Sequence, residues 1–208
     1  MQLISKGTFE ALHRPQKNLQ IEPYDERSYE VNCYYFHLGA LKQGERIVKV
    51  PDGAHLRRGQ ACVVFTLERF VLNERVFAIL GPCSELFLKG LALYHSPTID
   101  PGFDGALELR LHNLSDRTVP LQFGMRIGKV VFFDVSDTIM HLDKYVRVER
   151  EKVAWVARRR AAEEIRKLAE GLTKEELFPS PRDIWVEKTI DSEWGESGRR
   201  CPFLVNEE

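Results

Sequence analysis

The clearest pattern in this sequence is an alternation of apolar and polar residues after position 105. Leu107, Leu109 and Leu111 alternate with charged or polar neighbours, and successive side chains of a strand point to opposite faces. We therefore predict a strand over Ala106–His112 with its leucines in the core. Comparable short segments, bounded by turn residues, occur at Arg46–Val50, Gln60–Leu67, Arg75–Leu80, Val119–Phe123 and Arg126–Val135. Their close spacing predicts a mainly β domain, either a barrel or a sandwich.

The spacing of apolar residues changes after residue 146. Apolar residues recur every three or four positions from Val153 to Leu172, which predicts an amphipathic helix that ends near Gly171. Thr173 and Glu176 have the spacing of a capping box, so we predict a short second helix that Pro179 ends. We divide the chain into a β domain, residues 1–146, and a helical C-terminal extension with a tail, residues 147–208.

Composition and charge restrict the partners that we expect. The chain has 208 residues, 43% of them hydrophobic, with 30 basic and 31 acidic residues, so no overall field favours nucleic acid or an anionic membrane. The basic cluster Arg158–Arg160 could attract phosphates, but Glu163 and Glu164 follow it closely on the helix, so we interpret it as a solvated helix face. No apolar run is long enough to span a membrane and no secretory signal is visible, so we predict a cytoplasmic protein.

The four cysteines show no spacing typical of a metal site. Cys33, Cys62, Cys83 and Cys201 form no Cys-x-x-Cys pair and have no histidine at ligand spacing. We interpret them as structural thiols and predict no metal held by protein side chains.

The candidate chemistry lies just before the alternating strand. Pro101 and Gly102 predict a tight turn after Asp100, and Gly105 lets the chain leave it. The turn would hold the carboxylate of Asp100 and the ring of Phe103 at the mouth of the strand, an arrangement that suits a small polar ligand. The alternative is that Asp100 caps its own turn and Phe103 belongs to the core.

Several segments, in the same order, resemble the dCTP deaminase and dUTPase superfamily. Thr98-Ile-Asp-Pro-Gly-Phe-Asp-Gly105 resembles the Ile-Asp-Pro-Gly-aromatic-x-Gly turn of these enzymes. The other similar segments are Arg27–Val31, Leu56–Gln60, Thr66–Glu68 and Gly124–Phe132. The resemblance covers roughly residues 27 to 136 and does not include the helical extension.

This resemblance implies a distorted jelly-roll-like β-barrel of the dUTPase type, assembled as a homotrimer with nucleotide sites between subunits. It implies a deoxyribonucleoside triphosphate as ligand, with Mg²⁺ bound through the phosphates. Asp100 would hydrogen-bond the sugar 3′-hydroxyl and position the attacking water, which is reasonable for a carboxylate. Phe103 would lie against the deoxyribose and leave no room for a 2′-hydroxyl.

The phosphate-binding positions of the superfamily are changed in this chain. Cys83 stands where dUTPases carry an arginine, and Leu88 stands where dCTP deaminases carry a second one. A triphosphate therefore loses charge-assisted donors. Ser84, Lys89 and Lys129 are the residues that we predict to bind substrate in their place.

The residue that transfers protons in the deaminases is also changed in this chain. Ten residues after the turn aspartate these enzymes have a glutamate, but this chain has Arg110, and a guanidinium is no base at neutral pH. Glu108 lies on the same strand face about 7 Å away and is our candidate catalytic carboxylate, with Arg110 as a substrate-binding residue. The alternative is that Glu108, Arg110 and His112 form a polar cross-strand network.

Three functions remain open at this stage. The first is hydrolysis of dCTP or dUTP, by deamination or by release of diphosphate. The second is a catalytically silent nucleotide-binding regulator. The third is a structural trimer whose C-terminal helix binds another protein.

Overall fold

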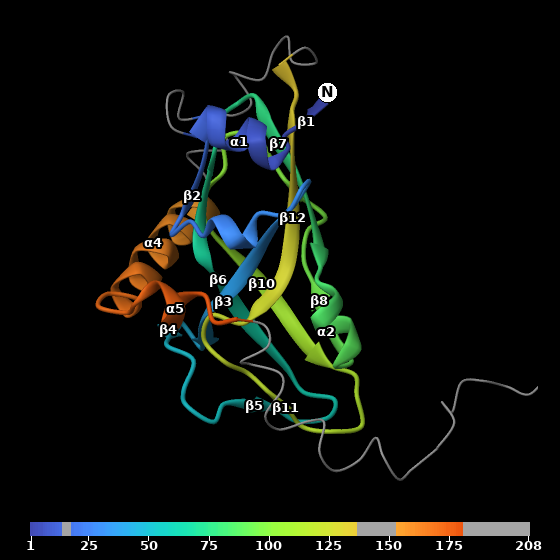
Figure 1. The fold of residues 1–208 in the computed structure, drawn as a ribbon. Helices are drawn as coiled ribbons and strands as arrows, with labels where there is room; N and C mark the ends of the chain where they lie inside the picture. The colour runs from blue at the N-terminus through green and yellow to red at the C-terminus, as the bar shows by residue number, and fades with distance from the viewer. Residues whose placement is uncertain (14–17, 137–152, 181–208) are drawn as a thin grey trace, which may run out of the picture.

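The computed structural model describes residues 1–13, 18–136 and 153–180. The chain is mainly β and its main sheet curls into a half-barrel, which confirms the predicted fold class (Figure 1). Every pairing in the sheet is antiparallel, and the order of its main path is β8-β10-β6-β3-β12-β7-β9. The strands of this path are β3 (Tyr34–Gln43), β6 (Ala61–Leu72), β7 (Val76–Pro82), β8 (Leu91–Tyr94), β9 (Thr98–Ile99), β10 (Asp104–Asn113) and β12 (Arg126–Asp134).

Short elements complete the half-barrel. Strands β1 (Gln2–Leu3), β2 (Leu19–Glu22) and β4 (Arg46–Val48) pair with β12, β6 and β3, respectively, and β5 (His55–Leu56) pairs with β11 (Val119–Pro120). Helix α1 (Lys6–His13) lies at one end of the sheet, and the β5–β11 pair lies at the other (Figure 1). Helix α2 (Ser84–Leu88) follows β7.

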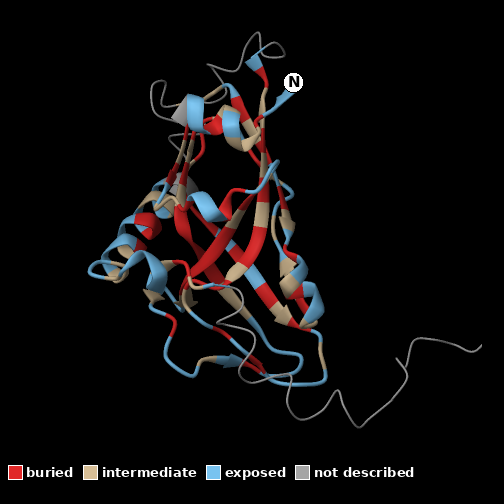
Figure 2. Cartoon of the chain, viewed as in Figure 1, coloured by how far each residue is buried: buried red, intermediate tan, exposed pale blue. Residues whose placement is uncertain are grey.

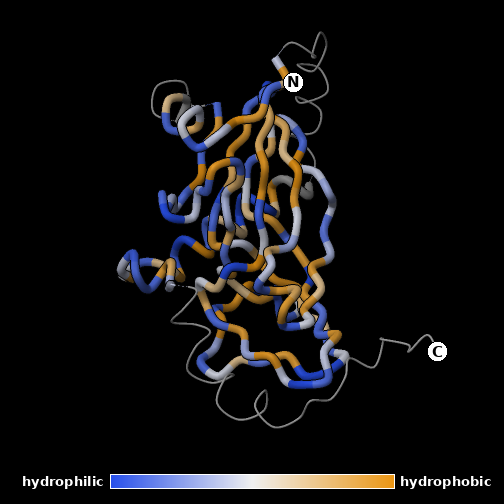
Figure 3. Tube along the Cα trace, turned by 45° about the vertical axis from the view of Figure 1, so that its right-hand side comes forward, coloured by the Kyte–Doolittle hydropathy of each residue, from blue (hydrophilic) through white to orange (hydrophobic). Residues whose placement is uncertain are grey.

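The main core fills the inside of the curl. Phe36, Phe70 and Phe132 are fully buried there, with neighbouring ring centroids 6.3 to 6.4 Å apart. The leucines of β10 face the same core, and Leu107, Leu109 and Leu111 are at most 6% exposed. Figures 2 and 3 show buried and hydrophobic residues concentrated along the strands. The alternating pattern of β10 is thus confirmed.

A second core lies on the outer face of the sheet, beneath the C-terminal helices. Helix α4 (Val153–Leu168) packs across β10 and β6 and places Ala161, Ala162 and Ile165 on Phe65, Leu67 and Ala106. Helix α5 (Lys174–Leu177) begins with the predicted capping box: the Thr173 hydroxyl accepts from Glu176 N, and the Glu176 carboxylate accepts from Thr173 N. The predicted boundary at residues 146 and 147 lies outside the described residues.

The Thr66-Leu-Glu68 segment is a bulge in β6. The β10–β6 register passes from Ala106↔Arg69 directly to Glu108↔Phe65, so three residues of β6 stand opposite Leu107. The Thr66 hydroxyl donates to Glu68 O at 2.7 Å and accepts from Leu107 N at 2.9 Å. The hydroxyl thus replaces ladder bonds that the bulge removes.

The bulge also turns the carboxylate of Glu68 inward. It accepts a hydrogen bond from His37 N at 2.9 Å and lies 2.6 Å from His37 Nδ1, and both residues are buried. Phe178, which follows α5, makes an edge-to-face contact with the imidazole, with ring centroids 5.0 Å apart. This buried polar pair joins β3 to β6 beneath the C-terminal extension.

Candidate functional site

The turn after β9 has the geometry that its sequence predicts. Phe103 N donates to Asp100 O at 3.2 Å, and Gly102 has a φ of 81°, which fits the glycine position of a type II turn that follows proline. Two further bonds fix it to the strand connection: Gly102 N donates to Asn73 O at 3.0 Å, and Leu72 N donates to Phe103 O at 2.8 Å. The turn therefore presents Asp100 and Phe103 from a rigid backbone.

Both side chains line one small cavity of about 110 Å³. Asp100 is exposed at its edge, whereas Phe103 is 4% exposed and forms a wall. Glu108 and Arg158 also line it. The cavity has the volume of a few water molecules and so can hold one sugar or one polar group, while the rest of a nucleotide would lie outside it.

Glu108 already has an ion-pair partner from another strand. Lys42 Nζ, from β3, donates to Glu108 Oε1 at 2.9 Å, and this hydrogen bond raises the pKa of Lys42. Both side chains are partly exposed, at 34% for Lys42 and 40% for Glu108. A role for Glu108 in proton transfer would require this ion pair to open.

The remaining polar residues of the same strand face do not join Glu108. Arg110 lies between Tyr94 and Val63 in the sheet and does not line the cavity. His112 Nε2 lies 3.2 Å from Gly59 O. In the part of the chain that the structure describes, no hydrogen bond links Glu108, Arg110 and His112 to one another, and the cross-strand partner of Glu108 is Lys42. The alternative of a polar network in a trimer channel or at the surface stays a prediction.

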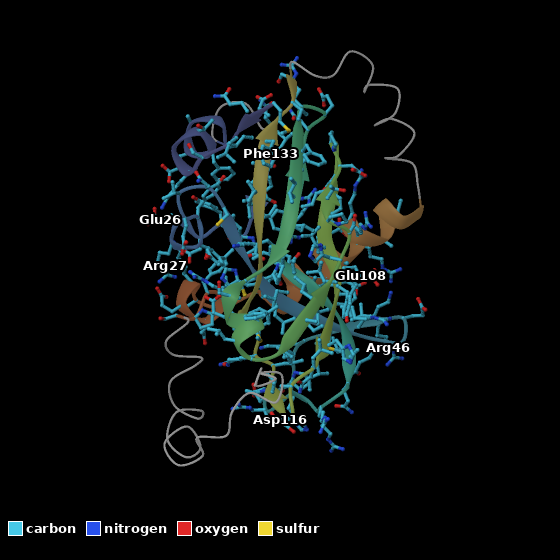
Figure 4. All side chains as sticks on the ribbon, turned by 90° about the vertical axis from the view of Figure 1, so that its right-hand side faces the viewer. Glu26, Arg27, Arg46, Glu108, Asp116 and Phe133 are labelled. Carbon is cyan, nitrogen blue, oxygen red and sulfur yellow. The ribbon has the colours of Figure 1, made fainter. Side chains whose placement is uncertain are left out.

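The predicted phosphate-binding residues lie elsewhere in the protomer. Ser84 begins α2, Lys89 ends it, and Lys129 stands opposite Gly81 in the β12–β7 ladder. None of them lines the cavity, and α2 lies across the sheet from α4 (Figure 1). Figure 4 likewise shows Arg27, from the first similar segment, on the opposite side from Glu108. Within one protomer the candidate residues therefore form two groups, one at the cavity and one near α2 and β12.

Burial changes the chemistry at α2. It raises the pKa of the Cys83 thiol to about 12, and the thiol lies 3.5 Å from Arg126 O. Burial also lowers the pKa of the Lys89 ammonium to about 8. Cys33 and Cys62 are free and half-buried, with thiol pKa values that burial raises, while Cys201 lies outside the described residues. A buried, protonated thiol at Cys83 cannot replace an anion-binding arginine.

Arg158 lines the cavity, although the sequence pattern favours a solvated helix face for it. Its guanidinium carbon lies 5.5 Å from the centroid of the Phe103 ring. The solvated-face interpretation holds for Arg160, which is 80% exposed and pairs with Glu164 at 3.0 Å. Arg158 and Arg159 instead lie half-buried, and Arg159 Nε lies 3.2 Å from Asp104 Oδ2. The sequence carried no signal to separate these three arginines, because their environments differ only through tertiary packing.

A larger cavity of about 450 Å³ lies between α4, α5 and strands β2 and β6. Glu22, Arg69, Glu163, Arg166 and Glu170 contribute charges of both signs to its walls. It contains none of the predicted site residues. We therefore place the candidate site at the smaller cavity, where a turn-held carboxylate and an aromatic ring converge.

Comparisons with known proteins identify the family of this chain. A model of the family described as dCTP deaminase-like matches residues 3–135. The dCTP deaminase of Pyrococcus horikoshii is 31% identical over 125 residues, which are 59% of this chain and 80% of that protein. The dUMP-forming dCTP deaminase of Aquifex aeolicus is 30% identical over 129 residues, covering 55% of this chain and 72% of that protein.

Solved structures show weaker similarity. The 2′-deoxycytidine 5′-triphosphate deaminase of Agrobacterium tumefaciens has a TM-score of 0.48 at 19% identity, covering 63% of this chain and 48% of that chain. A dUTPase of Staphylococcus bacteriophage 80alpha has a TM-score of 0.41 at 14% identity, covering 56% of this chain and 90% of that chain. The family model matches well over half of the sequence and ends before α4. On that match, this chain belongs to the dCTP deaminase-like family.

Proposed function

We propose that this protein binds a deoxyribonucleotide, with the sugar in the cavity between Asp100 and Phe103. The observation that carries the proposal is the presentation of a carboxylate and a ring by one rigid turn at one cavity. Among the described residues, the Asp100 carboxylate has no hydrogen bond or ion pair. It is therefore available to accept a hydrogen bond from a sugar hydroxyl.

The reaction that we propose is hydrolysis of dCTP or dUTP. Water positioned by Asp100 would attack the α-phosphorus and release diphosphate, a step that needs one carboxylate to orient water. Deamination, in which water attacks C4 of cytosine and ammonia leaves, needs a further proton carrier. Glu108 is the carboxylate in reach, but it is bound to Lys42. The geometry therefore favours diphosphate release over deamination.

We propose that the protein acts as a homotrimer. In one protomer Asp100, Phe103 and Glu108 lie apart from Ser84, Lys89 and Lys129, so a single nucleotide could use both groups only across a subunit contact. Phe87 and Leu88, on α2, are 79% and 81% exposed, and large exposed apolar side chains favour such a contact.

Magnesium would enter with the triphosphate in this proposal. The described residues contain no group of three His, Cys, Asp or Glu side chains that could hold an ion, and an ion bound through phosphates needs few protein ligands. None of the described helices is long and apolar enough to cross a membrane. A cytoplasmic location remains part of our proposal.

Calorimetry with dCTP, dUTP, dCMP and dUMP, with and without Mg²⁺, tests binding, and release of ammonia and diphosphate tests turnover. We expect Asp100→Asn to abolish turnover and to weaken binding by about tenfold, the value of one good hydrogen bond to a charged group. Asp116→Asn is the matched control, because Asp116 is 84% exposed and does not line the cavity. Unchanged binding and turnover in Asp100→Asn would remove the proposed site.

A catalytically silent regulator is the second candidate, favoured by Cys83 and Arg110 at positions where the similar enzymes carry an arginine and a glutamate. It predicts binding of the same nucleotides with no product formed. A protein that binds none of them would instead be the structural trimer.

A further inference from the structure

The three consecutive arginines of α4 have three different environments. Arg159 pairs with Asp104 at 3.2 Å and Arg160 with Glu164 at 3.0 Å. Among the described residues, Arg158 has no ion pair or hydrogen bond, and its contact is the face of Phe103 at 5.5 Å. It is also the arginine of the three that lines the cavity with Asp100. Its guanidinium donors are therefore available to a ligand.

Helix α4 holds Arg158 at the cavity through several fixed contacts. Gly105 packs so closely on the helix that a Cβ there would lie 2.7 Å from Arg158 Cβ and 2.8 Å from its carbonyl carbon. Asp104 accepts two hydrogen bonds from Arg69, at 2.8 and 3.1 Å, and pairs with Arg159 as well. Ile165 is fully buried on the sheet. The helix backbone at position 158 is thus held against the sheet, beside the cavity.

The charges around the cavity suit a ligand with a hydroxyl and an anionic group. Lys42 offsets the charge of Glu108, which leaves the carboxylate of Asp100 and the guanidinium of Arg158 facing one space. A guanidinium forms strong, paired hydrogen bonds with phosphate oxygens. Its contact with a phenyl ring is weaker than such a pair.

We propose that Arg158 is the phosphate-binding residue of this cavity, and that it leaves the Phe103 ring when a phosphate arrives. This inference rests on the proposed deoxyribonucleotide site. A nucleoside has no phosphate for the guanidinium to bind, so its binding does not depend on Arg158. The residue that supplies the charge lies outside the segment that matches the family model.

Calorimetric titration of dCMP and deoxycytidine into the wild-type protein, Arg158→Ala, Arg158→Gln and Arg160→Ala tests whether Arg158 binds the phosphate. In both Arg158 variants we expect dCMP to bind about tenfold or more weakly, the effect of one lost charge-assisted pair. We expect deoxycytidine to bind as it does to the wild-type protein, because it carries no phosphate for Arg158 to bind. Arg160→Ala, a matched change on the same helix, should bind both ligands as the wild-type protein does.

The other outcomes separate this inference from the proposed function. If the wild-type protein binds dCMP and the Arg158 variants bind it equally well, the inference is wrong and the site stands. Tighter binding of both ligands by the variants would show that Arg158 only covers the ring, which also overturns the inference. Equal loss of both ligands with a lower Tm in both variants would assign Arg158 a structural role. If the wild-type protein binds no nucleotide, the site and the inference both fail.

Discussion

Replacement of Thr66 by valine tests whether the β6 bulge depends on one hydroxyl group. Thr66 is fully buried, and its Oγ1 both donates to Glu68 O and accepts from Leu107 N. Valine has nearly the same shape and fills the same space, but it can make neither hydrogen bond. The substitution therefore leaves a buried carbonyl and a buried N–H without this partner.

The expected loss follows from these two groups. Each buried polar group left unsatisfied costs about 1–3 kcal/mol, and the added apolar surface of a methyl group offsets less than about 1 kcal/mol. We therefore expect Thr66→Val to lower the free energy of unfolding by about 1–6 kcal/mol. That is a large part of the total for a domain whose stability is about 5–15 kcal/mol.

Urea denaturation followed by far-UV circular dichroism measures the change. Thr118→Val is the control, because Thr118 is exposed and lies outside the bulge, and we expect it to stay within about 0.5 kcal/mol of the wild-type value. A loss below about 0.5 kcal/mol in Thr66→Val, with an unchanged m value, would refute the reasoning. The bulge would then be held by the packing around it and not by the hydroxyl.

Three further changes test the site, the extension and α2. Phe103→Ala should narrow the ratio of CMP to dCMP dissociation constants, because the ring that excludes a 2′-hydroxyl is removed; an unchanged ratio contradicts that role. Ile165→Ala should speed hydrogen exchange along α4, because removing a fully buried isoleucine costs about 2–5 kcal/mol; Val156→Ala, at a position 58% exposed, is the control. Lys89→Met should be more stable than the wild-type protein below pH 8, because burial lowers the folded-state pKa of Lys89 from 10.5 to about 8. Between about pH 8 and 10.5 the unfolded wild-type chain binds more protons than the folded one, so wild-type stability rises with pH. The difference in urea midpoint between the two proteins should therefore shrink over that range. A constant difference in urea midpoint across that range would contradict a lowered pKa for Lys89.

The strands that could be predicted are those with one buried and one open face. Strand β10 alternates because its leucines enter the core while Glu108 and Arg110 stay exposed. Strand β3 was not predicted, because five consecutive residues, 36–40, are buried and the alternation disappears. The capping box at Thr173 could be predicted since it depends on residues only three positions apart.

The residues of the candidate site likewise fall into those that the sequence predicts and those that only tertiary packing brings to the cavity. Asp100 and Phe103 could be paired from the sequence because one four-residue turn fixes them both. Glu108 follows from strand periodicity, and the structure brings it to the same cavity. Arg158 lies more than fifty residues along the chain, and its place depends on how α4 packs against β10. The partner of Glu108, Lys42 on β3, is likewise set by sheet order and not by local pattern.

The packing of α4 also decides which experiment can identify its role. The second core consists of residues from β3, β6 and β10 together with Ala161, Ala162, Ile165 and Phe178, so the helices and the sheet bury each other. Truncation before α4 would expose Phe65 and Leu67, each now 4% exposed, and would destabilise the sheet that carries the cavity. Loss of nucleotide binding in a truncated chain would therefore not separate a missing guanidinium from a damaged fold. Substitution of Arg158 alone keeps the apolar contacts of α4, and this is why the single-residue variants can assign the charge to the site.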